Sequence, residues 1–290
     1  MIRFLTFSQF HNKNPVAGST QIRVNQLLKY WPDAELYLYG ENPDVLIFQK
    51  VYIAVDYQFP LHFEGIKILD ICDPDWLDGR TTVKEMADAM DAVTCPTEAI
   101  AEFIRQFTDK PVIVIPDRFD LSIIPARKKH TGIAKTVVWF GYSHNAEILR
   151  YALPVLQELG LKLRIISDND PIINRYSERD ANEYYKFIKY DEDTIYDELR
   201  KADIALIPKG ARPHDVFKSN NRTVKSILAG LPVASTADKL RELMKPEARE
   251  AEVDSVYNQT WKEYDVKKSV LEYKGLIRLL ERKRAEKQQT

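Results

Sequence analysis

The sequence predicts an α/β protein with two doubly wound domains, in which helices cover both faces of a mostly parallel sheet. Short apolar runs alternate with amphipathic segments through both halves of the chain, as they do in sheets built from strand–helix units. A polar, basic stretch over residues 121–134 interrupts this alternation once. With 290 residues, 44% of them hydrophobic, the chain is long enough for two domains with separate cores.

The first predicted domain spans residues 1–125. It opens with a buried strand, "IRFLTF", and continues with a polar loop and a helix, "TQIRVNQLLKYW", that Pro32 closes. Three short apolar runs then predict strands covered on both faces: "AELYLY", "DVLIFQ" and "GIKILDIC". The remaining elements are a helix, "VKEMADAMDAV", a strand, "AVTCP", a helix, "TEAIAEFIRQF", and a strand, "PVIVIPD". Thr97 is the expected N-cap of the second of these helices.

The second predicted domain spans residues 135–265 and repeats the same order. It follows a basic run, "RKKH", that we interpret as a solvated linker, with contact to phosphates as the alternative. Its strands are "TVVWFG", "LKLRIISD", "YKFIKY", "DIALIP" and "LPVAST". Its helices are "AEILRYALPVLQELG", a segment near Asp180 to Tyr185, "EDTIYDELRKA", and the start of "KSNNRTVKSILAGLPVAST". A helix over residues 266–290, with apolar positions at Val270, Leu271, Leu276 and Leu279, is expected to pack back toward the first domain.

Composition excludes several classes of protein. The formal net charge of −1 gives no global sign of a protein that coats nucleic acid or an anionic membrane. Cys72 and Cys95 are the only cysteines, which predicts neither a zinc site nor a disulfide framework. No apolar run is long enough for a transmembrane helix or a signal peptide. We therefore expect a cytoplasmic protein.

The segment "KSNNRTVKSILAGLPVAST" places cations at the start of a predicted helix. Val224, Ile227 and Leu228 form an apolar stripe expected to face the sheet, which leaves Arg222 and Lys225 on another side. Cations at a helix N-terminus oppose the macrodipole, at a cost of about 0.3–1 kcal/mol each. A bound phosphate removes that cost, because it interacts with the cations and with the unpaired backbone N–H groups.

These residues therefore predict a diphosphate site, and a solvated basic face is the alternative. Ser219 or Asn220 is the expected N-cap of the helix. The residues proposed to bind the diphosphate in this segment are Lys218, Ser219, Asn220, Asn221, Arg222 and Lys225.

Two other loops carry residues suited to the same ligand. In "PVAGST", Gly18 permits close approach of the backbone to a ligand, and Ser19 or Thr20 can cap the helix that follows. In "FGYSHNAE", Gly141 provides a tight turn, and Ser143 and His144 can point toward a ligand. An ordinary capped turn and an ordinary loop histidine are the alternatives for these two loops.

Three carboxylates follow the strand in "LDICDPDWLD". Asp70, Asp73 and Asp75 can supply a general base or hold a divalent metal, and turn formation beside Pro74 is the alternative.

Together these segments resemble nucleotide-sugar glycosyltransferases of the GT-B fold, particularly the retaining group related to glycogen and sucrose synthases. The similar residues are "VVWFGYSHNAEILRYALPVLQEL", "ADIALIP" and "KSNNRTVKSILAGLPVAST" in the second half, with "AVTCPTEAIAEFIRQF" and "PVIVIPDRFDL" in the first. The resemblance implies two Rossmann-like domains facing a central cleft, with the donor bound by the second.

The chain departs from the pattern of that group. Phe217 and Lys225 stand where the group typically carries two glutamates; the second glutamate, at the position of Lys225, binds the donor ribose. Tyr142, Ser143 and His144 follow the glycine where an arginine and a lysine are common. The segment is similar instead to a variant in which serine, asparagine and arginine meet the diphosphate.

The resemblance implies transfer of a sugar from a nucleotide-diphosphate donor without a metal or a further cofactor. A UDP-sugar is the first expectation for the donor and a GDP-sugar the second. The acceptor is left open among a glycan, a lipid-linked glycan, a protein and a modified nucleic-acid base. Asp73 and His11 are the candidates for a catalytic base. A non-catalytic binding or scaffold subunit and a nucleotide-sugar epimerase are the alternative functions.

Overall fold

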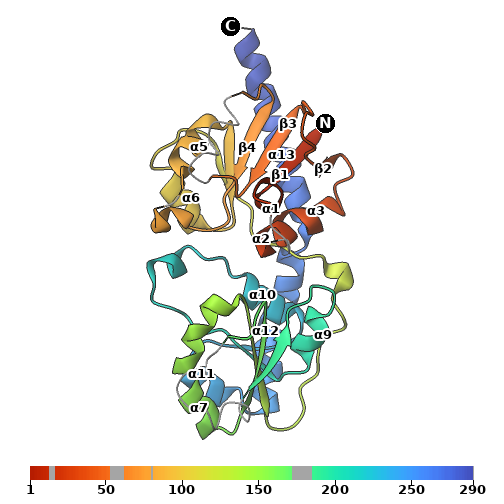
Figure 1. The fold of residues 1–290 in the computed structure, drawn as a ribbon. Coiled ribbons are helices and arrows are strands. Elements are labelled where there is room, and N and C mark those ends of the chain that lie inside the picture. The colour runs from red at the N-terminus through yellow and green to blue at the C-terminus, as the bar shows by residue number, and fades with distance from the viewer. Residues whose placement is uncertain (13–16, 53–61, 80, 172–184, 290) are drawn as a thin grey trace. The chain divides into compact units, whose positions relative to one another are not determined.

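The computed structural model describes residues 1–12, 17–52, 62–79, 81–171 and 185–289 (Figure 1). The chain forms two compact units. Unit 1 consists of Met1–Asp120, Arg212–Ser219 and Tyr264–Thr290, and unit 2 of Leu121–Ala211 and Asn220–Glu263. Residues 212–219 thus group with the first unit, whereas the sequence analysis placed them in the second domain. Residues 264–290, predicted to form a helix that packs toward the first domain, group with unit 1.

Unit 1 contains a parallel sheet of six strands in the order β2-β1-β3-β4-β5-β6. The strands are β1 (Ile2–Thr6), β2 (Ala34–Leu36), β3 (Val45–Gln49), β4 (Ile66–Asp70), β5 (Ala92–Cys95) and β6 (Val112–Val114). The central strands read as continuous apolar runs because both faces of the sheet are covered. β3, for example, is buried at all five positions.

Helices cover both faces of the unit 1 sheet (Figure 1). The helical elements are α1 (Phe7–Phe10), α2 (Gly18–Thr20), the π-helical turn η1 (Gln21–Asn25), α3 (Gln26–Leu28), the 3₁₀ turn η2 (Asp75–Asp78), α5 (Val83–Ala89), α6 (Glu98–Ile104) and α13 (Val266–Gln288). One core layer joins Phe4, Ile47 and Ile68 to Trp31 and to Tyr273 of α13. The other layer packs α5 and α6 against the opposite face of the sheet.

Unit 2 contains a second parallel sheet, with five strands in the order β11-β10-β7-β8-β9. The strands are β7 (Thr136–Phe140), β8 (Lys162–Ser167), β9 (Tyr185–Lys189), β10 (Ile204–Leu206) and β11 (Val233–Ala234). The helical elements are the 3₁₀ segment η4 (Ser143–Tyr151), α7 (Leu153–Glu158), α9 (Ile195–Arg200), α10 (Asn221–Leu228), α11 (Ala237–Glu242) and α12 (Pro246–Glu263). Trp139 of β7 lies in the core that joins this sheet to η4, α7 and α11.

Several elements differ from the prediction. The predicted helix over residues 146–160 is a 3₁₀ segment followed by α7, with Pro154 in the first turn of α7. Neither α11 nor α12 was predicted. The run "RKKH" is only partly solvated: Lys129 is exposed, but Arg127 pairs with Glu250 and His130 is buried. Most of the helix predicted near residues 180–185 lies outside the described residues.

Candidate functional site

The carboxyl edge of the unit 1 sheet carries a row of buried polar residues. The strand register pairs Thr6 with Gln49, Gln49 with Asp70, and Asp70 with Thr94. All four side chains belong to residues that are buried. The strand order reverses between β1 and β3, and open parallel sheets bind ligands outside the carboxyl ends of their strands at such a point. Residues just beyond this row are therefore candidates for a site.

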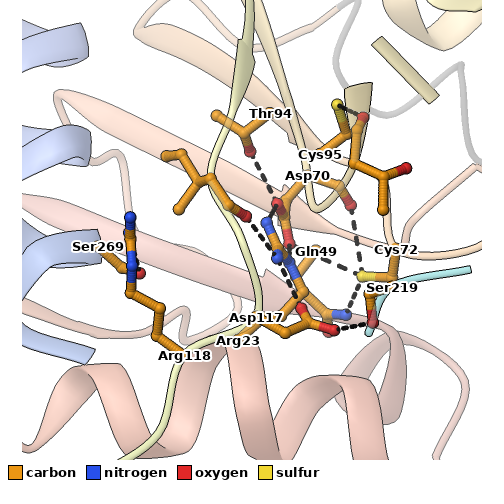
Figure 2. Close-up of polar contacts among 12 residues, drawn as sticks. Arg23, Gln49, Asp70, Cys72, Thr94, Cys95, Asp117, Arg118, Ser219 and Ser269 are labelled. Carbon is orange, nitrogen blue, oxygen red and sulfur yellow. Dashed lines mark hydrogen bonds and ion pairs between the residues drawn. The ribbon is translucent and has the colours of Figure 1, made fainter. Parts of the chain in front are cut away.

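A buried ion-pair network continues this row (Figure 2). Arg23, in the π-helical turn η1, donates from Nε and Nη2 to the two carboxylate oxygens of Asp70 at 2.7 and 2.6 Å. Its Nη1 donates to Asp117 Oδ1 at 2.8 Å. Burial opposes the charge of Arg23, but the charge of Asp70 outweighs it and raises the pKa of Arg23. Asp70, one of the three carboxylates considered as a base or metal ligand, is thus committed to this network.

Asp73 lies in a second cluster, just after the strand ends. Lys50 donates to Asp73 Oδ2 at 2.6 Å and lies 3.3 Å from Asp75 Oδ2. Tyr52 OH donates to the same Asp75 oxygen at 2.9 Å. Burial alone would lower the pKa of Lys50, but Asp73 and Asp75 raise it above its ordinary value. The side chain of Asp73 is 43% exposed, so this carboxylate is both oriented by a cation and accessible from solvent.

The backbone at Lys50 is unusual. Its φ of 57° lies in the left-handed region that few non-glycine residues adopt. Lys50 follows β3 directly, at the point where the strand order reverses. Such conformations persist only where the surrounding structure holds the backbone in place. They are found disproportionately at functional sites.

The ring of His11 packs against two aromatic side chains, one of which also contacts Lys50. Its ring lies 4.8 Å from that of Phe7 and 5.1 Å from that of Phe10, measured between centroids. Lys50 Nζ lies 5.6 Å from the centroid of the Phe7 ring. Contacts through Phe7 and Lys50 therefore link His11 to Asp73, the other predicted catalytic residue.

The loop of Gly18 and Ser19 is a helix start without a side-chain cap. Gly18 begins α2, and Ala17 occupies the N-cap position, so neither Ser19 nor Thr20 caps the helix as expected. Thr20 Oγ1 instead donates to Gln49 Oε1 at 2.8 Å and lies 3.1 Å from Ser8 Oγ. Gly18 and Ser19 are partly exposed beside this buried chain of hydroxyl groups.

Lys218 and Ser219 have partners in unit 1. Ser219 Oγ donates to Asp117 Oδ2 at 2.6 Å (Figure 2). Lys218 Nζ lies 3.8 Å from Asp215 Oδ1. The predicted diphosphate segment is therefore divided between units after Ser219.

The loop after β7 is the corresponding feature of unit 2. Gly141 has a φ of 154°, in the region that favours glycine. Its carbonyl accepts from Ser167 Oγ at 2.7 Å. The next turn is fixed by Asp168, whose Oδ1 accepts from the backbone N–H of Ser143 at 2.7 Å. Strand order reverses between β10 and β7, so this loop lies where a doubly wound sheet binds its ligand.

His144 stacks beside this loop on an exposed aromatic residue. The rings of Tyr142 and His144 lie 5.6 Å apart at an interplanar angle of 16°. Tyr142 is 47% exposed. The predicted residues Gly141, Ser143 and His144 are thus brought together on one turn, with Tyr142 in place of a basic residue.

The start of α10 lies against the same loop. A methyl group placed on Gly141 would lie 3.6 Å from Arg222 Nη1 and 3.3 Å from the Trp139 ring. The Arg222 guanidinium lies 5.9 Å from the Trp139 ring centroid. Asn221 is the first residue of α10, and Asn220 occupies the N-cap position without a side-chain cap hydrogen bond. A cation and a helix N-terminus therefore meet a glycine turn, the combination that suits a phosphate.

Lys225 is buried, contrary to the prediction. The sequence analysis predicted that it lies on a side of the helix away from the apolar stripe, but in the structure it is only 4% exposed. Its Nζ lies 3.2 Å from Tyr190 OH and 3.4 Å from Glu192 Oε1, and also 5.7 Å from the centroid of the Tyr196 ring. Burial lowers the pKa of Lys225, while Glu192 acts in the opposite direction.

Several residues of these clusters had no predicted role, among them Lys50, Asp168 and Glu192. The first two directly follow strands, at Gln49 and Ser167, so their places in the sequence could have identified them. Glu192 could not be identified in this way, because its ion pair with Lys225 joins separate elements of unit 2.

Two general features are absent from the described part of the chain. None of its helices is long and apolar enough to span a membrane. Among the same residues, no three or more His, Cys, Asp or Glu side chains are grouped so that they could hold a metal ion.

No protein-family model matches the chain, and no curated protein matches its sequence. Solved structures do match its fold. A DNA-modifying β-glucosyltransferase, solved with and without uridine diphosphoglucose, has 10% identity over 95% of this chain and 99% of its own, with a TM-score of 0.58. AviGT4, a glycosyltransferase involved in avilamycin A biosynthesis, has 11% identity over 96% of this chain and 97% of its own, with a TM-score of 0.56.

A third structure gives the same result. An α-glucosyltransferase in complex with UDP-glucose and DNA containing an abasic site has 8% identity over 81% of this chain and 80% of its own, with a TM-score of 0.58. At these identities the likeness concerns the fold. The two parallel α/β units, one with six strands and one with five, together with these comparisons confirm the predicted fold class: the chain has the GT-B fold.

Proposed function

We propose that the protein transfers a sugar from a nucleoside-diphosphate donor to an acceptor hydroxyl group. One observation carries this proposal: Arg222, at the start of α10, lies against the Gly141 turn where strand order reverses in unit 2. A cation, the N–H groups of a helix start and a glycine that admits close approach suit a diphosphate. The GT-B fold is consistent with this use.

The chemistry at the donor end is electrostatic. As the bond between the sugar and the diphosphate breaks, negative charge develops on the departing diphosphate. In this proposal Arg222 and the N–H groups at Asn220 and Asn221 stabilise that charge, and Gly141, Ser143 and His144 line the same turn. No step requires a metal. We assign Lys225 a supporting role, since it is buried against Glu192 and Tyr190.

The acceptor end lies in unit 1. Asp73 is the proposed base that removes the proton of the acceptor hydroxyl, and Lys50 orients its carboxylate. His11 is the alternative base. An inverting reaction needs such a base, whereas a retaining reaction can proceed without one.

The fold comparisons suggest which donor to test first. Two of the similar structures were solved with UDP-glucose, so a UDP-sugar is the first donor to test and a GDP-sugar the second. The acceptor stays open among a glycan, a lipid-linked glycan, a protein and a modified nucleic-acid base.

Calorimetric titration of UDP, GDP, ADP and CMP tests the donor site. We expect one nucleoside diphosphate to bind, and Arg222→Ala to weaken it by roughly 10- to 100-fold, the loss expected for a charge-assisted hydrogen bond. Arg150→Ala is the matched control, because Arg150 is an exposed arginine of the same unit that pairs with Glu147. Equal binding by both variants would contradict the assignment of Arg222, and no binding to the wild type would contradict the proposed function.

Turnover of the bound nucleotide sugar tests the base. If Asp73 is the base of an inverting reaction, Asp73→Asn lowers kcat by about 10²–10⁴-fold and leaves the Kd of the nucleoside diphosphate unchanged. The same loss in His11→Gln, with Asp73→Asn active, would transfer the role to His11. Two further results would select the alternative functions. Binding without transfer to any acceptor indicates a non-catalytic subunit, and a new sugar stereocentre without an acceptor indicates an epimerase.

A further inference from the structure

Residues Arg212–Ser219 connect β10 to α10, two elements of unit 2, yet they group with unit 1. We call this segment the strap. It has local structure of its own, a 3₁₀ turn over Pro213–Val216. Asp215 holds this turn, since its Oδ2 accepts from the backbone N–H of Arg212 at 3.0 Å.

An aromatic cluster anchors the middle of the strap. The ring of Phe217 meets that of Trp76 edge to face at a centroid distance of 5.3 Å, and that of Phe103 at 6.1 Å. Trp76 and Phe103 are themselves stacked at 4.3 Å. Thr97 Oγ1 adds a hydrogen bond to the carbonyl oxygen of Phe217 at 3.1 Å. Phe217 therefore fills a defined aromatic site of unit 1.

Polar contacts anchor the strap on either side of Phe217. His214 Nε2 lies 3.0 Å from Asp78 Oδ1. At the other end, Ser219 Oγ donates to Asp117 Oδ2 at 2.6 Å, and the opposite oxygen of Asp117 accepts from the buried Arg23 (Figure 2). The last residue of the strap is thus tied, through Asp117, to the buried guanidinium of Arg23.

The turn η2 (Asp75–Asp78) joins these anchors to the proposed acceptor site. Asp75 lies 3.3 Å from Lys50 Nζ, within the cluster that contains Asp73. Trp76 and Asp78 of the same turn contact the strap through Phe217 and His214. One short turn therefore contacts both the proposed base cluster and the segment that leads into α10.

We infer that Phe217 and Ser219 are positioning residues: by anchoring the strap, they restrain the start of α10, the turn proposed to bind the diphosphate. Asn220, the N-cap residue of α10, follows Ser219 by a single peptide bond. Anchoring Ser219 therefore restrains the backbone that enters the first turn of α10. The kinetic consequence rests on the proposed function, in which that turn binds the departing diphosphate; the structural consequence does not.

Hydrogen exchange and kinetics on matched variants test the inference. The variants are Phe217→Ala, Ser219→Ala and the conservative Ser219→Thr, with Val216→Ala as the control, since Val216 is 70% exposed in the same strap. We expect about tenfold faster amide exchange at residues 224–226, where the N–H groups of α10 first have acceptors within the helix, for Phe217→Ala and Ser219→Ala, because local opening there becomes easier. We also expect kcat to fall about tenfold with the diphosphate Kd nearly unchanged, because Arg222 and the helix N–H groups remain. Ser219→Thr keeps the hydroxyl and restores both values.

The outcomes separate the two proposals. Exchange and kcat values for Phe217→Ala and Ser219→Ala that equal those of Val216→Ala would overturn the positioning role. If the wild-type protein turns over no nucleotide sugar, the proposed function fails, and the exchange measurement alone decides the strap. Faster exchange then supports the anchoring, and unchanged exchange overturns it.

Discussion

Arg23 holds two carboxylates at once in the interior of unit 1. It makes a two-point contact with Asp70 and a single contact with Asp117, and its side chain is 4% exposed. A buried charge of this kind is retained only where its partners are fixed, because loss of one partner leaves the others uncompensated. The network therefore holds Asp117 in place as the acceptor for Ser219.

His130 is a buried, neutral side chain in unit 2. Arg249 Nε lies 3.3 Å from His130 Nδ1, and an arginine can only donate, so Nδ1 accepts. His130 Nε2 then carries the proton and donates to the carbonyl oxygen of Gly230 at 2.8 Å. Burial lowers the pKa of His130, and the charges of Lys128 and Arg249 act in the same direction.

This arrangement predicts a loss of stability in mild acid. Because the pKa of His130 is lower in the folded state, the unfolded chain binds a proton more readily as the pH falls below about 6.5, the ordinary value for histidine. The contribution of His130 to stability is therefore constant above that pH and declines below it. Chemical denaturation at pH 7.5 and pH 5.0 measures this effect, with His130→Gln for comparison. The free energy of unfolding should fall more for the wild type than for the variant, and equal falls would contradict the assignment.

Side chains with local partners were predictable, and those with distant partners were not. Thr97 was predicted as an N-cap, and its Oγ1 accepts from Ile100 N–H at 3.3 Å, three residues away. Ser219 was an equally good candidate, but it donates to Asp117, 102 residues earlier. The hydroxyl group has the same chemistry in both cases. What differs is a partner whose position only the folded chain determines.

At the scale of elements, α10 joins the candidate donor site to the core of unit 2. Val224 and Leu228 are buried as predicted, and the helix ends in a Schellman motif. Gly230 N–H donates to the carbonyl of Ile227 at 2.8 Å, and Leu231 N–H to that of Ser226 at 2.9 Å. Gly230 has a φ of 79° and fits this motif without strain.

Gly160 ends α7 with the same motif and provides a matched comparison. A methyl group on Gly230 would lie 2.6 Å from the backbone nitrogen of Lys128, whereas one on Gly160 would meet nothing within 4 Å. We expect Gly160→Ala to destabilise the protein by about 1–2 kcal/mol, the ordinary cost of the left-handed conformation. Gly230→Ala should cost roughly 3 kcal/mol or more, because the clash adds to that conformational cost. Urea denaturation measures both, and equal losses would show that Lys128 moves aside without cost.

Most elements could be predicted because their apolar periodicity is local. The strands of both sheets lie within the predicted runs, whereas α12 was missed, since only Arg249, Val253 and Thr260 are buried along its 18 residues. The 3₁₀ segment η4 was predicted as α-helix, because periodicity alone does not separate the two forms over a few turns.

At the scale of the whole molecule, the chain crosses between the two units after Asp120, Ala211, Ser219 and Glu263. Two of these crossings are joined, because Phe119 pairs with Asp265 in an isolated parallel bridge. Alternating strands and helices predicted two domains, but a segment of eight residues that returns to the first unit leaves no periodic signal. The strap could therefore be identified only from its contacts with Trp76, Phe103 and Asp117 in the folded chain.

Hydrogen exchange with and without a saturating nucleoside diphosphate tests whether the diphosphate binds at the Gly141 turn and the start of α10. If it does, protection should appear in peptides that cover residues 141–145 and 220–224. Arg222→Ala should weaken the protection in both peptides together, while Arg150→Ala should leave it intact. Binding without protection in either peptide, or protection confined to unit 1, would show that the diphosphate binds elsewhere.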